Sequence, residues 1–188
     1  LSDDFITTIP GRKAFEIIRS LGNTQIELAV SDTSVVIKSS NSSFKLQALA
    51  ANEFPLFDAS GSENYFGVKQ KEIKSLFTKT QFSMAQQDVR FYLNGLLLEI
   101  SPNTLVSVGT DGHRLSKSKI SIEKTKINET SYILPRKAVQ EVQRIISDQG
   151  ETKITFSDNR AIFEIGPTTL VTKLIDGSFP DYTRVIPK

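Results

Sequence analysis

An internal repeat constrains the fold of this chain more than any other feature of its sequence. Residues 9–14 resemble residues 134–138, and further along Phe54-Pro55 is matched by Phe179-Pro180. In both matches the prolines are separated by 125 residues. Because the matches keep their order and spacing, the sequence predicts two similar units in tandem.

The two predicted units are unequal in length. The second unit starts with residues 65–128, and this stretch has no counterpart before Leu1. We therefore expect a truncated domain over residues 1–63 and a complete one over residues 64–188. Half of a domain leaves apolar surface without its cover, so the chain is expected to be a fragment of a longer protein.

Each unit is predicted to consist of a helix followed by an antiparallel strand meander. Apolar residues at helical spacing predict helices over residues 11–20, 69–80 and 136–147. Asn94-Gly95 is predicted to be a hairpin turn. The fold class is therefore α+β. Short apolar segments between polar turns predict strands over residues 25–30, 34–38, 43–48, 89–93, 96–101, 104–109, 115–122, 153–156, 160–165 and 168–174.

Basic side chains are concentrated in the three predicted helices. These helices carry ten Lys and Arg residues against three Glu, whereas the net charge of the whole chain is only +2. If the repeat places the helices on one face, that face attracts the phosphates of a nucleic acid, independently of base sequence. The alternative is that Lys and Arg, which favour helices, simply cover solvent-exposed faces.

The composition excludes several classes of function. The chain has no cysteine and one histidine, which excludes disulfides, thiol catalysis and Cys- or His-rich metal centres. Neither phosphate-binding glycine motif is present, so no cofactor and no metal are expected. No apolar run is as long as a membrane helix requires, and the first residues do not form a signal peptide. We expect a cytoplasmic protein without a membrane partner.

The single histidine lies in the segment GTDGHRL, residues 109–115. Asp111-Gly112 is a strong turn signal between two predicted strands, which favours a hairpin tip or the wall of a pocket. A catalytic histidine needs an orienting group and a nucleophile within reach, and one hairpin rarely supplies both. An enzyme that uses Asp111, His113 and Arg114 is therefore the alternative.

Residues 86–93, QQDVRFYL, combine amides, an arginine and two aromatic residues at the entry to a predicted strand. As structure, Phe91 and Tyr92 would face opposite sides of that strand, so that one of them belongs to the core. As function, amide and aromatic side chains at a loop end can contact a nucleic-acid backbone or stack on a base. The pattern does not distinguish the two possibilities.

Several motifs together resemble one known family, the bacterial sliding clamps, which are the beta subunits of DNA polymerase III. The resemblance covers essentially the whole chain and is most specific in the second unit. The motifs that carry it are residues 80–85, 87–90, 92–95, 110–115, 135–137, 176–177 and 179–182.

This resemblance implies a DNA-clamp fold with three domains, helices on one face and sheets on the other. Two copies close head to tail into a ring around duplex DNA, and the ring raises polymerase processivity without catalysis. Residues 1–63 correspond to the C-terminal half of the first clamp domain and residues 64–188 to the second. By the same resemblance, the third domain is expected to be missing from this chain.

The resemblance also implies partners and a site for them. The family's cleft lies between its second and third domains, and it binds short peptide motifs of the polymerase III catalytic subunit, the clamp loader, and other polymerases and repair proteins. Such an anchor needs an apolar patch with a polar rim. The residues of this chain that match the cleft are Leu93, Thr110, Gly112, His113, Arg114, Leu115, Pro180, Arg184 and Val185.

Two further surfaces follow from the resemblance. Sequence-independent contacts to double-stranded DNA are expected from Gln87, Phe91, Tyr92, Arg136 and Lys137. The homodimer interface is expected at Lys13, Ile17, Phe44 and Leu46. An ordinary DNA-binding module remains an alternative, which would hold linear DNA stably, whereas a closed clamp slides off free ends.

Overall fold

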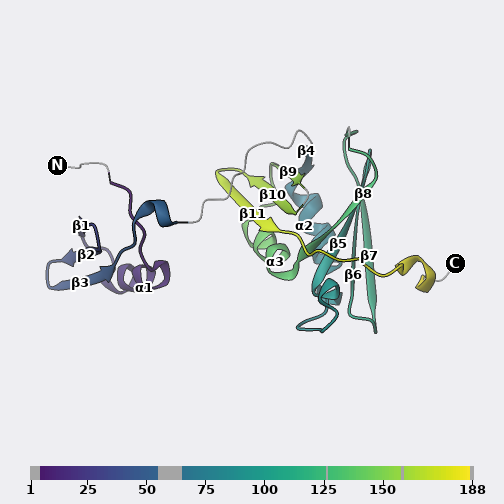
Figure 1. Cartoon of the computed structure of the whole chain (residues 1–188). Helices are drawn as coiled ribbons and strands as arrows, with labels where there is room; N and C mark the ends of the chain where they lie inside the picture. The colour runs from purple at the N-terminus through teal and green to yellow at the C-terminus, as the bar shows by residue number, and fades with distance from the viewer. Residues whose placement is uncertain (1–4, 55–64, 126, 158, 187–188) are drawn as a thin grey trace. The chain divides into compact units, whose positions relative to one another are not determined.

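The computed structural model describes residues 5–54, 65–125, 127–157 and 159–186, and divides the chain into two compact units (Figure 1). Unit 1 comprises Leu1–Asp58 and unit 2 comprises Ala59–Lys188. The predicted domain boundary after residue 63 falls outside the described residues. The α+β fold class with antiparallel sheets is confirmed.

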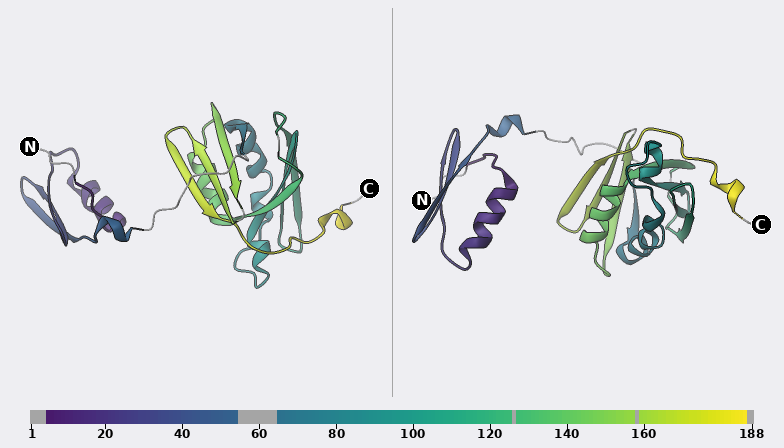
Figure 2. Two further views of the ribbon diagram at one scale, coloured as in Figure 1. Left: turned by 45° about the horizontal axis from the view of Figure 1, so that its top comes forward. Right: turned by 90° about the horizontal axis from the view of Figure 1, so that it is seen from below.

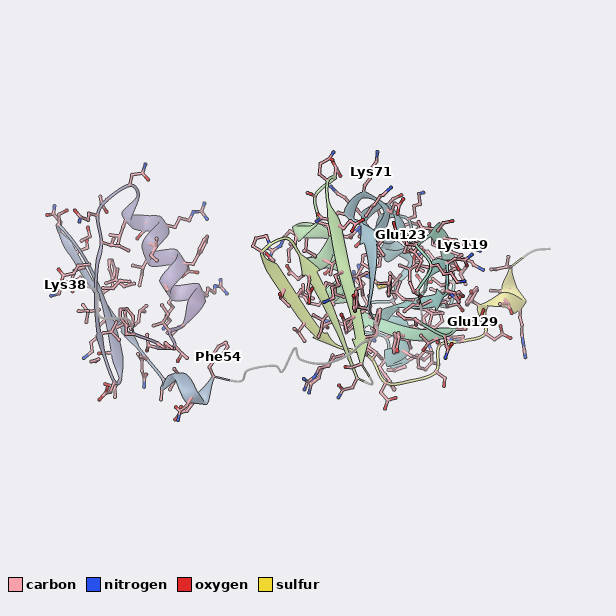
Figure 3. All side chains as sticks on the ribbon, turned by 90° about the horizontal axis from the view of Figure 1, so that it is seen from above. Lys38, Phe54, Lys71, Lys119, Glu123 and Glu129 are labelled. Atoms are coloured by element: carbon pink, nitrogen blue, oxygen red, sulfur yellow. The ribbon has the colours of Figure 1, made fainter. Side chains whose placement is uncertain are left out.

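Unit 1 is one helix followed by an antiparallel meander in the order β1-β2-β3. Ala14 on the helix packs with Ile37 and Leu46 from the sheet to form a small buried cluster. Lys38, next to Ile37, points to the face of the sheet away from the helix (Figure 3). The elements are α1 (Gly11–Leu21), β1 (Glu27–Ser31), β2 (Ser34–Ser39), β3 (Ser42–Gln47) and the 3-10 turn η1 (Ala51–Glu53).

Unit 2 contains two helices and two four-stranded antiparallel sheets, in the orders β7-β6-β5-β8 and β11-β10-β9-β4. The helices contact each other and pack against strands of both sheets (Figure 2). The elements are β4 (Tyr65–Lys69), α2 (Gln70–Thr78), η2 (Gln81–Ser83), η3 (Phe91–Asn94), β5 (Gly95–Ser101), β6 (Thr104–Thr110), β7 (Leu115–Ser121), β8 (Thr130–Pro135), α3 (Arg136–Ile145), β9 (Glu151–Ser157), β10 (Arg160–Ile165), β11 (Thr168–Lys173) and η4 (Tyr182–Val185).

The two halves of unit 2 exchange their first strands. β4 comes directly before α2 but pairs with β9 of the second half. β8 comes directly before α3 but pairs with β5 of the first half. One large apolar cluster spans both halves as a result, and it includes Phe77 of α2, Val139 of α3 and Phe163 of β10. Neither half can bury its apolar residues without the other.

The structure confirms the repeat that the sequence predicts. α1 follows Pro10 and α3 follows Pro135, and each helix is followed by three antiparallel strands. The match extends to single hydrogen bonds, because the Thr8–Leu49 bridge of unit 1 lies where the Ile175 amide donates to the Ile133 carbonyl in unit 2. The two copies therefore share their order of elements and this backbone contact.

Two predictions about residues 89–95 are wrong. The predicted strand over residues 89–93 is a bend followed by the 3-10 turn η3, and Gly95 begins β5 instead of forming a hairpin turn. The Asn94 side chain explains the difference, since its Oδ1 accepts from the Asp88 amide and its Nδ2 donates to the Asp88 carbonyl. These bonds close the loop on itself and replace a strand ladder.

The C-terminal segment packs onto unit 2. Tyr182 on η4 is buried with Leu97, Val108 and Ile133, on the face of the β5–β8 sheet that does not join the main core. Tyr92 and Leu115 lie at the edge of this second, smaller cluster. The C-terminal segment is thus held beside the loop of residues 87–94.

Candidate functional site

A cavity of about 620 Å³ opens on unit 2 where three segments meet. These segments are the loop before β5, the turn between β6 and β7, and the C-terminal segment around η4. The lining residues are Arg90, Tyr92, Leu93, Thr110, Gly112, His113, Arg114, Leu115, Pro180, Asp181, Tyr182, Val185 and Ile186. We call this cavity the cleft.

The turn between β6 and β7 is fixed by its own side chains. Gly112 has φ 89°, and its amide donates to the Thr110 hydroxyl over 3.1 Å. The same hydroxyl donates to the Arg114 carbonyl at 2.7 Å. Asp111 Oδ1 accepts from the backbone amides of His113 and Arg114 at 2.9 and 3.0 Å. The turn predicted at Asp111-Gly112 is confirmed.

Asp111 serves this turn and not the histidine ring. The backbone amides of His113 and Arg114 hold the pKa of the Asp111 carboxyl below its usual value, and the Arg114 guanidinium adds to the effect. Asp111 Oδ2 is bonded to Arg114 Nε at 3.0 Å, and Arg114 Nη2 donates to the Phe82 carbonyl at 2.8 Å. The carboxylate is therefore occupied by backbone and guanidinium donors, an arrangement that does not resemble a catalytic His-Asp pair.

The loop of residues 87–94 forms the second wall. Arg90 Nε and Nη2 donate to the two carboxylate oxygens of Asp88 at 3.0 and 2.8 Å. These bonds lower the pKa of the Asp88 carboxyl to about 2. Arg90 Nη2 also donates to the Asp111 carbonyl over 3.3 Å, and thereby links this loop to the β6–β7 turn. Leu93 is buried below and contributes apolar surface.

The third wall is the C-terminal segment. Asp181 caps η4 by accepting from the Thr183 amide at 3.2 Å, and it also pairs with Arg184 Nε at 2.8 Å. The Thr183 hydroxyl has the largest effect on the Asp181 carboxyl and lowers its pKa. The Thr183 amide and Arg184 lower it further, against an opposing effect of burial. Val185, on the same turn, keeps 69% of its surface exposed. An apolar side chain is thus available at the rim of the cleft.

The structure brings together eight of the nine cleft residues that the resemblance implies. Arg184 is the exception: its side chain points to solvent, paired with Asp181, and does not line the cavity. Five lining residues are not in that set: Tyr92, which was expected to contact DNA, and Arg90, Asp181, Tyr182 and Ile186. Arg90 belongs to residues 86–93, the segment of amide and aromatic residues noted in the sequence, so the sequence did indicate that this region has a role.

The residues expected to contact DNA are not equivalent in the structure. Gln87 and Phe91 are exposed on the loop, and Lys137 is exposed on α3. Tyr92 is partly buried and lines the cleft. Arg136 is partly buried, and its Nη1 donates to the Met84 carbonyl at 3.1 Å, so it ties α3 to the start of the loop. Gln87 has φ 55°, a conformation that non-glycine residues rarely adopt.

The four expected interface residues lie together in unit 1. Ile17 and Phe44 are partly buried against the small cluster that contains Leu46, and Lys13 is exposed on α1. Leu46 keeps only 5% of its surface exposed, so it acts within the unit. Phe15, on the same helix, is more available, with 64% exposed.

The described residues contain neither a metal-binding cluster nor a membrane-spanning helix. The described part of the chain holds no group of three or more His, Asp or Glu side chains placed to bind a metal ion. Among these residues, no helix is long and apolar enough to cross a membrane.

Comparisons with known proteins agree with one another. Residues 67–181 match the family described as DNA polymerase III beta subunit, central domain, and residues 2–58 match the N-terminal domain of the same subunit. The beta sliding clamp of Pseudomonas aeruginosa is 39% identical over 183 residues, which is 96% of this chain and 50% of that protein. That of Escherichia coli is 40% identical over 185 residues, or 97% and 50%.

Solved structures give the same result. The crystal structure of DNA polymerase III subunit beta from Pseudomonas aeruginosa aligns with a TM-score of 0.90 and 37% identity, covering 100% of this chain and 53% of that one. A sliding clamp from this organism bound to griselimycin aligns with a TM-score of 0.87 at the same identity, covering 100% and 52%. The chain thus spans about half the length of these relatives.

Proposed function

Because the chain belongs to the DNA polymerase III beta subunit family, we propose that it is part of a sliding clamp, a ring that surrounds duplex DNA and tethers the replicative polymerase. Unit 1 is then the C-terminal half of the first clamp domain, and unit 2 the second clamp domain. The protein acts by holding its partners in place and performs no catalysis. It works in the bacterial cytoplasm, at the nucleoid.

The cleft is the observation that carries this proposal. Its floor is formed by Leu93 and Leu115, and Pro180 and Val185 add apolar surface at its edge. Arg90, His113 and Asp181 contribute polar groups to its lining. Such a site suits a short peptide with one or two large apolar anchors. The peptides are segments of the polymerase catalytic subunit, the clamp loader, other polymerases and repair proteins.

The charge on α2 and α3 supports a weak attraction to DNA. Lys71 is exposed on α2 and points outward (Figure 3). Lys137 and Arg144 are exposed on α3 but share Glu141 as a partner, and Lys74 pairs with Asp148. Exposed cations attract phosphates in a non-specific and salt-sensitive way, and the ion pairs with Glu141 and Asp148 keep this attraction weak. A clamp needs such contacts, because it must slide.

Ring closure is proposed to use unit 1. β3 is an edge strand of its sheet, and α1 lies beside it with Ile17 and Phe44 only partly buried. An edge strand with apolar neighbours is suited to pairing with another chain. In the full ring this pairing would join two copies head to tail.

A peptide-binding experiment tests the proposal. The probe is a fluorescent peptide from the C-terminal region of a polymerase III catalytic subunit, and binding is followed by anisotropy and by amide NMR of the chain. Val185→Asp is expected to weaken binding by about tenfold or more, because it places a charge among the apolar anchors. The wild-type chain should show shifts at Gly112 and Leu115.

Val89→Asp is the matched control, because Val89 is 95% exposed on the loop and does not line the cleft. It should bind the peptide like the wild type. If the wild-type chain shows no shifts at the cleft with millimolar peptide, the proposed function is wrong. Equal weakening by both substitutions would also contradict it.

A further inference from the structure

Tyr182 is the most deeply buried attachment of the C-terminal wall to the rest of unit 2, and Phe179 and Ile186 pack partly buried against the same cluster. Of the four η4 residues, Thr183, Arg184 and Val185 are exposed, and only Tyr182 is buried, with 7% of its surface accessible. The position of Pro180 and Val185 therefore depends on where the Tyr182 side chain binds.

The Tyr182 side chain is held at three points. Its ring packs with Leu97 and Val108 on the sheet. Its hydroxyl donates to Glu99 Oε2 at 2.6 Å. The Lys117 ammonium lies over the ring, 4.9 Å from its centre. A short bond to a charged acceptor is stronger than one between neutral groups, so the hydroxyl contributes strongly to this attachment.

The sheet presents these three holding groups in register. Leu97 of β5 pairs with Val108 of β6, which pairs with Lys117 of β7. Glu99 lies two residues further along β5 and therefore on the same face. β5 also starts directly after η3, which carries Leu93 of the cleft floor. One strand thus connects the floor of the cleft to the anchor of its wall.

We propose that Tyr182 is a positioning residue for the cleft: its hydrogen bond to Glu99 holds Pro180 and Val185 in the peptide-binding arrangement before a peptide arrives. This inference rests on the proposed function of the cleft. Burial, with the Glu99 bond, raises the pKa of the Tyr182 hydroxyl, which keeps the proton needed for the bond across the ordinary pH range. The hydroxyl points to Glu99, so a peptide in the cleft does not need to touch it.

Positioning and contact have different kinetic signatures. If the wall is only partly ordered without the bond, the apparent affinity falls with the fraction of binding-competent molecules. If the C-terminal wall orders and disorders faster than the peptide binds, the loss of affinity appears as a lower association rate, and the dissociation rate stays the same. A lost peptide contact instead raises the dissociation rate.

Tyr182→Phe is the central variant, because it removes the hydroxyl and keeps the ring. We expect an association rate lower by about three- to tenfold for the polymerase peptide, with an unchanged dissociation rate. Glu99→Ala should give the same result, and the double variant should lose no more than either single variant. Glu99→Gln keeps an acceptor oxygen and should restore part of the rate.

Tyr65→Phe is the matched control, since Tyr65 also lies under a lysine, with Lys153 4.6 Å from its ring centre, but outside the cleft. It should bind like the wild type.

If the wild type binds and Tyr182→Phe keeps its association rate, the inference is wrong although the proposed function stands. A raised dissociation rate alone would also overturn it. If the wild type does not bind, the proposed function itself fails. Glu99→Ala decides the question should Tyr182→Phe lose its fold.

Discussion

Unit 1 and the second half of unit 2 are two copies of one structural repeat, a helix followed by three antiparallel strands, in different surroundings. In unit 2, α3 and its three strands join a fourth strand, β4, and pack with α2. In unit 1, α1 and its three strands have neither partner among the described residues of that unit. The buried clusters differ accordingly, with Ile37 in a cluster of three buried residues and Phe163 in one of nineteen.

This difference shows what a helix and three strands can and cannot bury without a second set of elements. The order of elements and even the bridge at Thr8 and Leu49 survive in unit 1. Some apolar side chains do not find cover, since Phe15 keeps 64% and Leu28 48% of its surface exposed. Local sequence therefore determines the elements, whereas most of the burial free energy comes from pairing two halves.

The largest expected effect comes from deleting the matching core side chain in each copy. Phe163 and Ile37 occupy equivalent positions in β10 and β2, and both are completely buried. Phe163→Ala should cost unit 2 about 3–5 kcal/mol and lower its melting temperature. Ile37→Ala should cost about 2–5 kcal/mol, which exceeds what so small a cluster can supply, so unit 1 loses its tertiary structure.

Residue-resolved amide NMR distinguishes these outcomes, because it reports each unit separately. In Ile37→Ala, signals of β1 to β3 should collapse while those of unit 2 remain dispersed. If unit 1 of this variant keeps its dispersed signals, its stability has another source and the comparison above is wrong.

The sequence predicted most of what is local in this fold. The helix starts after Pro10 and Pro135 and the meanders that follow were predicted, because helical spacing and turn residues are short-range signals. β4 and β8 were not predicted, since each pairs with strands of the other half. A strand defined by distant pairing has no complete signature in its own residues.

The cleft was predictable in part. Its residues were identified through a family resemblance, and the spacing of the residues alone indicated only the turn at Asp111-Gly112. Arg90 and Tyr182 were missed because their roles depend on Asp88 and Glu99, contacts that no short motif contains. Arg184 was expected in the lining, but its bond to Asp181 keeps it at the surface.

A smaller effect is expected from adding one methyl group to each unit. An alanine Cβ at Gly109 on β6 would lie 2.5 Å from the Thr80 carbonyl oxygen, whereas one at Gly11 on α1 would meet nothing within 4 Å. Gly109→Ala should therefore cost about 1–3 kcal/mol. Gly11→Ala should gain up to about 1 kcal/mol, because alanine favours a helix more than glycine does.

Urea unfolding of the two variants, followed by signals of the unit concerned, provides the measurement. The two changes in unfolding free energy are expected to have opposite signs, because the site in unit 2 is closely packed and the site in unit 1 is open. A cost of similar size at both positions would mean that α1 is covered in solution.

The smallest effect concerns a loop that only unit 2 possesses. The connections after α1 and α3 are short, whereas the one after α2 runs through residues 79–94 and contains Asp88 and Arg90. The Asp88 pKa is lowered from 3.8 to about 2 by hydrogen bonds from Arg90. A carboxyl group whose pKa is lowered in the folded state stabilises the loop at pH values above its ordinary pKa. This stabilisation is lost as the pH falls through the pKa of the folded state. The loop should thus open between pH 4 and 2.

Carboxyl ¹³C NMR of Asp88 measures this titration directly. Arg90→Gln should move the Asp88 pKa back toward 3.8 and shift the Gly112 amide, because the bond to the Asp111 carbonyl is lost as well. Asp148 is the control: Lys74 lowers its pKa, and Arg90→Gln should leave it unchanged. If Asp88 still titrates near its low value in Arg90→Gln, the loop owes its order to Asn94 alone. Unit 2 would then hold the loop and the β6–β7 turn independently of one another.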